Sequence, residues 1–92
     1  MDPKAARELD KRRKAEKKRL ERREEELLAA IESDEANKAA LQAAMAEPEN
    51  YADGAAMKRL QAELTALEAK IAQDIAAWEA VGVELGAYAD LN

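Results

Sequence analysis

The chain has 92 residues and a net charge of −5, and it contains neither histidine nor cysteine. Because 23 of its 44 apolar residues are alanine, it can build only a narrow apolar seam, so a deep core and a catalytic pocket are not expected. The missing residue types exclude a disulfide framework, a thiolate metal site and histidine-based catalysis.

Charge is divided unequally along the chain. Residues 1–24 carry eleven Lys or Arg against six Asp or Glu, a net of +5, whereas residues 25–92 carry four against fourteen, a net of −10. The two parts are therefore expected to meet different surroundings. No stretch is apolar enough to span a bilayer or to form a signal-peptide core, so a cytoplasmic location without membrane contact is expected.

The first predicted helix begins at Pro3, with Asp2 as its N-cap, and neither Gly nor Pro interrupts it up to residue 46. Apolar residues at spacings of three and four indicate a heptad seam that includes three charged members. The seam consists of Leu20, Glu24, Leu27, Ile31, Asp34, Lys38, Leu41 and Met45. Asp34 and Lys38 lie four residues apart on this helix and can pair with each other, and Lys38 can also extend toward a flanking acid such as Glu63 or Glu68.

A loop over residues 47–54 is predicted to separate two helices. Pro48 lacks the amide that a continuing helix needs, and Asp53 is placed to cap the second helix, which is expected over about residues 55–85. The second seam consists of Met57, Leu60, Leu64, Leu67, Ile71, Asp74, Trp78, Val81 and Leu85. Trp78 is expected to pack at the open end, opposite Glu24.

The two seams coincide when the chain folds back at the loop, since opposed residue numbers then sum to about 101 or 102, with Leu20 against Val81. The predicted fold is all-α, an antiparallel two-helix coiled-coil hairpin over residues 20–86 with an overhanging basic N-terminal arm. The arm, residues 1–19, is continuous with the first helix, and its residues 3–16 have no expected partner in the hairpin. Residues 87–92 are expected to fray.

The strongest candidate site is a run of nine cations within thirteen residues of the first helix. The run comprises Lys11, Arg12, Arg13, Lys14, Lys17, Lys18, Arg19, Arg22 and Arg23. On a helix of about 20 Å, this density suits the phosphates of a nucleic acid, and the lack of aromatic residues favours backbone contact over base stacking. The alternative is a solvated helix with pairs such as Lys17 with Glu21.

Other chemistries find little support. The acidic stretches do not match a calcium-binding loop, and no phosphate-cradling glycine motif occurs. We therefore predict no catalytic residue, no metal site and no cofactor for this chain.

Residues 27–85 resemble the C-terminal coiled-coil domain of the ABC-F proteins, duplicated soluble relatives of the ABC transporter ATPases. The resemblance rests on the tip residues Ala46-Glu47-Pro48 and Asn50-Tyr51-Ala52-Asp53, the ladder Leu60, Leu64, Leu67 and Ile71, and the closing Trp78-Glu79. It implies a parent protein that hydrolyses ATP in other domains, and a C-terminal domain that contacts nucleic acid. Basic sequence before the hairpin is also typical of that family.

Three hypotheses for function stay open at this point. The resemblance and the basic segment favour binding to DNA. Contact with RNA or the ribosome is the first alternative, because both are polyanions. A structural spacer or dimerisation coiled coil, self-associating through apolar positions such as Leu28 and Ile75, is the second.

Overall fold

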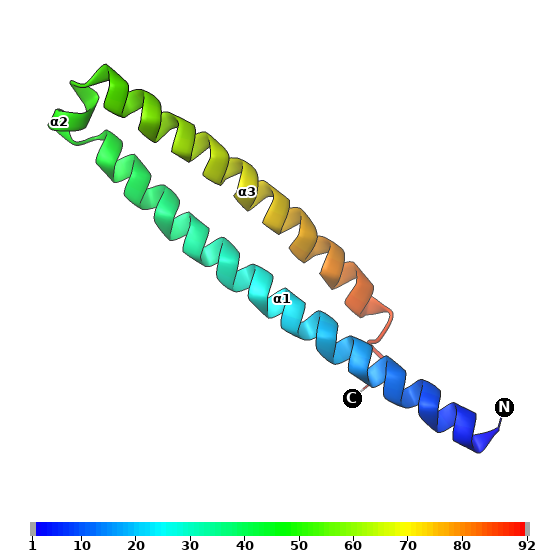
Figure 1. The fold of residues 1–92 in the computed structure, drawn as a ribbon. Helices are drawn as coiled ribbons and strands as arrows, with labels where there is room; N and C mark the ends of the chain where they lie inside the picture. The colour runs from blue at the N-terminus through cyan, green and yellow to red at the C-terminus, as the bar shows by residue number, and fades with distance from the viewer. Residues whose placement is uncertain (1, 92) are drawn as a thin grey trace.

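The computed structural model describes residues 2–91 as two long antiparallel helices joined by a short helical turn (Figure 1). The elements are α1 (Pro3–Met45), α2 (Pro48–Tyr51) and α3 (Gly54–Gly86), and the described residues contain no strand. This architecture confirms the predicted all-α hairpin. Met1 and Asn92, assigned above to the arm and to the fraying end, lie outside the described residues.

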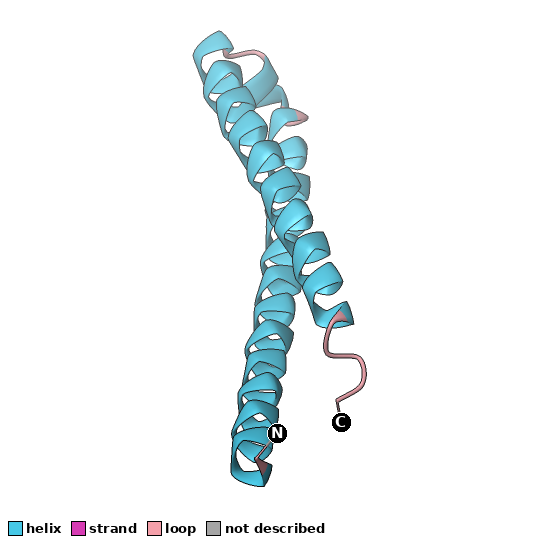
Figure 2. Ribbon diagram, turned by 90° about the vertical axis from the view of Figure 1, so that its right-hand side faces the viewer, coloured by secondary structure: helices cyan, strands magenta, loops and turns pink. Residues whose placement is uncertain are grey.

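The molecule is a rod of 73 × 16 × 15 Å with a radius of gyration of 21.0 Å, whereas a compact domain of this size has a radius of gyration of about 13 Å. α1 has 43 residues and α3 has 33, so the first part of α1 extends beyond the end of α3 (Figure 1). Seen from the side, the two helix axes are inclined to each other, and the residues after α3 run beside α1 (Figure 2).

Both long helices begin at the aspartates expected to cap them. Asp2 accepts a hydrogen bond from the amide of Lys4 at 3.4 Å, and Pro3 occupies the first helical position. Asp53 Oδ1 accepts from the amides of Ala55 and Ala56 at 3.0 and 3.2 Å. These contacts satisfy amides that have no partner within their own helix.

The turn between α1 and α3 contains more structure than the predicted loop. Pro48 opens the four-residue helix α2, where its fixed φ suits the first helical position and its missing amide costs nothing. The side chain of Asn50 reaches back and donates to the carbonyl oxygen of Ala44 at 2.8 Å. This bond supplies a donor to a carbonyl at the end of α1, which fixes the direction in which the chain turns.

Buried apolar residues form a single thin line between α1 and α3. They are Leu20, Leu27, Ala56, Leu64, Ile71 and Val81. Leu20, Leu27 and Val81 make one cluster near the end of α3, and Leu85 and Tyr88 pack against it. The contact of Leu20 with Val81 agrees with the predicted register.

Trp78 does not take the packing position predicted for it. Its exposed fraction is 36%, and Ala77 instead packs against the Leu20, Leu27 and Val81 cluster. At this end of the hairpin the seam of α3 therefore passes through Ala77, and the indole of Trp78 lies at the edge of the interface.

The predicted pairing of Asp34 with Lys38 is also wrong. Asp34, only 8% exposed, accepts from Lys70 of α3, whose Nζ lies 2.5 Å from Asp34 Oδ2 and 2.9 Å from Asp74 Oδ2. Lys70 therefore bridges Asp34 in the seam of α1 and Asp74 in the seam of α3. Asp34 thus pairs across the hairpin and not with Lys38 on its own helix. The hydrogen bonds to Asp34 and then to Asp74 raise the pKa of Lys70 above its ordinary value.

Leu27→Ala is expected to lower the free energy of unfolding by about 2–5 kcal/mol, because it opens a cavity in a core that has few other contacts. Leu9→Ala makes the same chemical change on α1 at a side chain that is 47% exposed, so it should have little effect. Urea titrations followed by circular dichroism measure both values. Equal losses for the two variants would contradict the described core.

Lys70→Ala is expected to lower the melting temperature at neutral pH, because Asp34 loses its cation while still buried. Since the pKa of Lys70 is raised in the folded chain, its contribution is complete below the ordinary lysine pKa and disappears as pH rises through the raised value. Thermal melts of the two proteins should therefore begin to converge as pH rises past about 10.4, the ordinary lysine pKa, and coincide only above the raised pKa of Lys70. Lys58→Ala, at an exposed position, is the control, and a difference independent of pH would refute the ion pair.

Candidate nucleic-acid interface

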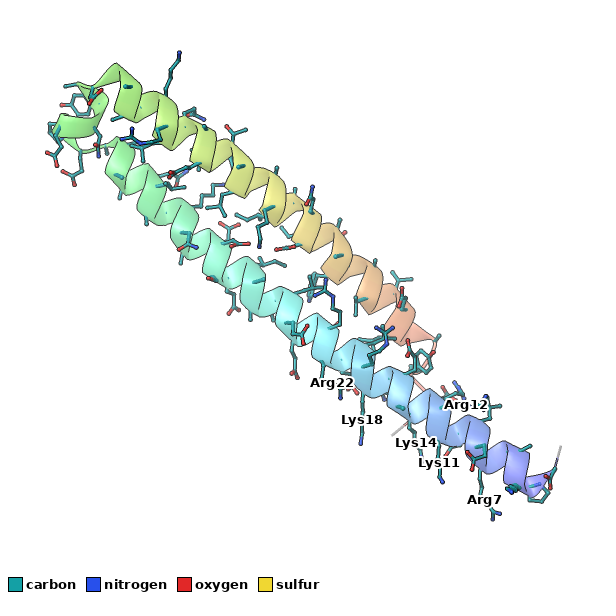
Figure 3. All side chains as sticks on the ribbon, viewed as in Figure 1. Arg7, Lys11, Arg12, Lys14, Lys18 and Arg22 are labelled. Atoms are coloured by element: carbon teal, nitrogen blue, oxygen red, sulfur yellow. The ribbon has the colours of Figure 1, made fainter. Side chains whose placement is uncertain are left out.

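All nine cations of the predicted segment lie on the first half of α1, but they occupy different sides of the helix. One group faces away from α3 and is called the outer row here (Figure 3). The outer row consists of Arg7, Lys11, Lys14, Lys18 and Arg22. Arg7 was missed by the sequence prediction, although its position four residues before Lys11 continues the same helical spacing.

The outer row follows from helix geometry. Its residues are separated by three or four positions, so they lie on one face of α1 and span about 22 Å from Arg7 to Arg22. All five are exposed. The seam residue Leu20 lies on the opposite side and is buried, so packing against α3 orients the row toward solvent.

Ion pairs within the outer row are few and exposed. Lys14 lies 3.0 Å from Asp10, and Lys11 lies 4.0 Å from Glu8. Among residues 2–91, the other three members, Arg7, Lys18 and Arg22, make no ion pair within 4.0 Å. Exposed pairs of this type contribute little free energy, so the row presents cations that a polyanion can engage.

Arg13 and Lys17, called the inner pair here, face the residues that follow α3. Arg13 Nη1 and Nη2 donate to Asp90 Oδ2 and Oδ1 at 3.3 and 3.1 Å, and Nη2 also donates to the carbonyl oxygen of Ala87 at 3.2 Å. The guanidinium carbon lies 5.7 Å from the centre of the Tyr88 ring. Lys17 Nζ donates to the carbonyl oxygen of Leu91.

The contacts of Arg13 give the arm a partner that lies after the hairpin, in the segment expected to fray. After Gly86 the chain forms turns, with the amide of Tyr88 bonded to Leu85 and that of Leu91 bonded to Tyr88. These turns bring Asp90 beside Arg13 of the arm. The heptad pattern ends with the second helix, so the sequence could not place residues 87–91 beside the arm. The fraying expected for these residues concerns their mobility and stays a prediction.

The remaining three cations of the segment, Arg12, Arg19 and Arg23, lie outside the outer row. Arg19 donates to both carboxylate oxygens of Glu16, at 2.6 and 3.0 Å, which lowers the pKa of Glu16 and raises that of Arg19. Arg23 lies 3.8 Å from Glu26. Arg12 points to the other side of α1 from the outer row (Figure 3).

The surface around the arm does not have the shape of a small-molecule site. Lys14, Lys17, Lys18 and Glu21 line a hollow of about 240 Å³, and a second hollow of about 180 Å³ borders Arg13. Both are smaller than the ligand pockets of about 300–1,000 Å³ that proteins commonly form. A partner that binds along the helix surface suits this shape better.

Two further properties concern residues 2–91 as a whole. No group of three or more acidic side chains in this part of the chain is arranged to hold a metal ion. None of its helices combines the length and the apolar character needed to cross a membrane.

A known family model matches most of the chain. The family model described as the ABC transporter C-terminal domain matches residues 4–81, which include the outer row, the turn and most of α3. No curated protein and no solved structure matches the chain.

Proposed function

Because the chain belongs to the family of ABC transporter C-terminal domains, we propose that it is a non-catalytic module of a cytoplasmic ABC-F ATPase and binds the phosphate backbone of DNA. The outer row is the observation that supports this proposal most directly. It offers a straight line of exposed cations with no aromatic side chain among them. ATP hydrolysis would belong to other domains of the parent protein.

The spacing of the outer row suits a phosphate backbone. Five cations over about 22 Å amount to one every 5–6 Å or so, and a DNA strand carries one phosphate per about 3.4 Å of helix axis. Each cation can therefore meet a phosphate without competing with its neighbour. Contacts of this type position a protein on nucleic acid and carry no sequence information, so binding independent of sequence is proposed.

The charge distribution supports contact through the first part of α1. Residues 1–24, which are the arm and the first residues of the hairpin, carry a net charge of +5, and the remaining 68 carry a net of −10. A polyanion is attracted to residues 1–24 and repelled by the rest of the hairpin, an effect that is largest at low salt. The rod would therefore project away from the bound nucleic acid, with α2 at its far end (Figure 1).

RNA, including ribosomal RNA, is the alternative partner. Phosphate contacts do not distinguish the two sugars, whereas contacts to the 2′-hydroxyl do. DNA is favoured here because it is the partner implied by the resemblance for this type of C-terminal domain. Comparison of DNA and RNA duplexes of the same sequence would separate the two.

A structural role has its own supporting observation. Leu28, Ile75 and Trp78 are 44%, 36% and 36% exposed, so apolar surface remains that a second copy could cover. In this alternative the hairpin is a spacer or dimerisation element. Sedimentation equilibrium tests it, since a mass that does not change with concentration argues against self-association.

Lys18→Gln combined with Arg22→Gln is expected to weaken binding to a 20-base-pair DNA duplex, because it removes two unpaired cations of the outer row. The slope of log K against log salt should decrease in magnitude by about 1.8, from 0.9 per phosphate contact. Fluorescence anisotropy between 50 and 200 mM salt measures both quantities.

The matched control removes two exposed cations outside the arm, Lys58→Gln with Arg59→Gln on α3. It changes the net charge equally and should leave the slope close to that of the unmodified chain. An equal loss in the control would show that net charge, not the outer row, determines binding. Absence of DNA binding by the unmodified chain at 50 mM salt would exclude the proposed function.

A further inference from the structure

We propose that residues 87–91 act as an intramolecular competitor for the nucleic acid, occupying Arg13 and Lys17 until a polyanion displaces them. The proposal rests on the proposed function, because it concerns the same arm. It adds a regulated part to the interface: the outer row is always available, whereas the inner pair becomes available only when the segment leaves.

Asp90 occupies Arg13 in the way a phosphate would. Two nitrogens of the guanidinium donate to the two carboxylate oxygens, at 3.3 and 3.1 Å. This paired geometry is the one in which arginine binds both carboxylates and phosphates. The Arg13 hydrogen bonds also hold the pKa of Asp90 below its ordinary value, so the carboxylate is charged at neutral pH and competes as an anion.

Lys17 is occupied by the same segment and lies next to the outer row. Its Nζ donates to the carbonyl oxygen of Leu91, and its side chain lines one hollow together with Lys14 and Lys18. Release of the segment would therefore add a cation directly beside two members of the outer row. The interface would become wider as well as more positive.

Tyr88 holds the segment in its blocking position. Its ring packs against the cluster of Leu20, Leu27 and Val81 and also lies under the guanidinium of Arg13. The ring thus links the end of the apolar seam to the charged contact. Such cation–aromatic contacts are weakly attractive at exposed sites, because the ring face carries partial negative charge.

The segment is bound weakly enough to be displaced. The side chains of Arg13 and Asp90 are 37% and 65% exposed, and exposed ion pairs are readily screened by salt and solvent. A nucleic acid offers many phosphates at once and gains counterion entropy for each contact. Competition therefore favours the polyanion once the outer row has brought it close.

A purely structural role for the segment predicts the opposite behaviour. If residues 87–91 served only to hold the arm in position, loosening them would leave binding unchanged or weaken it. If they compete, loosening them strengthens binding. The sign of the change therefore distinguishes the two roles.

Asp90→Asn is the test, with Glu68→Gln as a control that removes one exposed negative charge from α3 away from the arm. We expect Asp90→Asn to lower the Kd for a 20-base-pair DNA duplex by about two- to fivefold relative to the control, as loss of one exposed ion pair suggests. The slope of log K against log salt should become steeper by about 0.9–1.8, which corresponds to one or two additional phosphate contacts. Amide exchange at residues 87–91 of the unmodified chain should accelerate when DNA is added.

Linear polyphosphate, used in parallel, separates failure of this proposal from failure of the proposed function. If DNA does not bind but Asp90→Asn strengthens polyphosphate binding, the competition stands and the nucleic-acid function is wrong. If Asp90→Asn binds DNA and polyphosphate no better than Glu68→Gln, the competition is wrong whether or not DNA binds. Failure of both polyanions to bind either protein overturns the two proposals together.

Discussion

The antiparallel contact between α1 and α3 is the constraint on which the other features depend. Its buried apolar part is thin, with Leu20, Leu27 and Val81 at one end, and its polar centre is closed by Lys70 between two aspartates. This contact sets the register of the two helices. Because the register decides where α3 ends along α1, it also decides which cations of α1 extend beyond the hairpin.

Electrostatics then give the two ends of the rod different properties. The first half of α1 carries its cations on several sides, and the outer row faces away from α3 into solvent (Figure 3). Arg13 and Lys17 are drawn into contacts with the residues after α3. The basic run looks uniform in sequence, but in the structure the outer row is open to solvent and the inner pair is bound by the residues after α3. This difference is the physical basis of both proposals.

The local structure of the chain follows closely from its sequence. Asp2 and Asp53 cap the long helices as predicted because capping depends on one side chain and the amides of the next turn. The helices and their antiparallel register follow from apolar spacing and a proline at the turn. The prediction failed where the partner lies on the other helix: Asp34 pairs with Lys70, and Ala77 displaces Trp78 from the seam.

Sequence by itself thus determined the class of fold, the approximate ends of its helices and the position of the basic segment, because these depend on spacing, capping and composition. Only the tertiary structure decided how the nine cations divide between solvent and the chain itself. The reason is that this division depends on which face of α1 packs against α3 and on where residues 87–91 run after α3 (Figure 2). The turns after α3 bring Asp90 beside Arg13, and the heptad spacing of the sequence does not predict the direction of these turns.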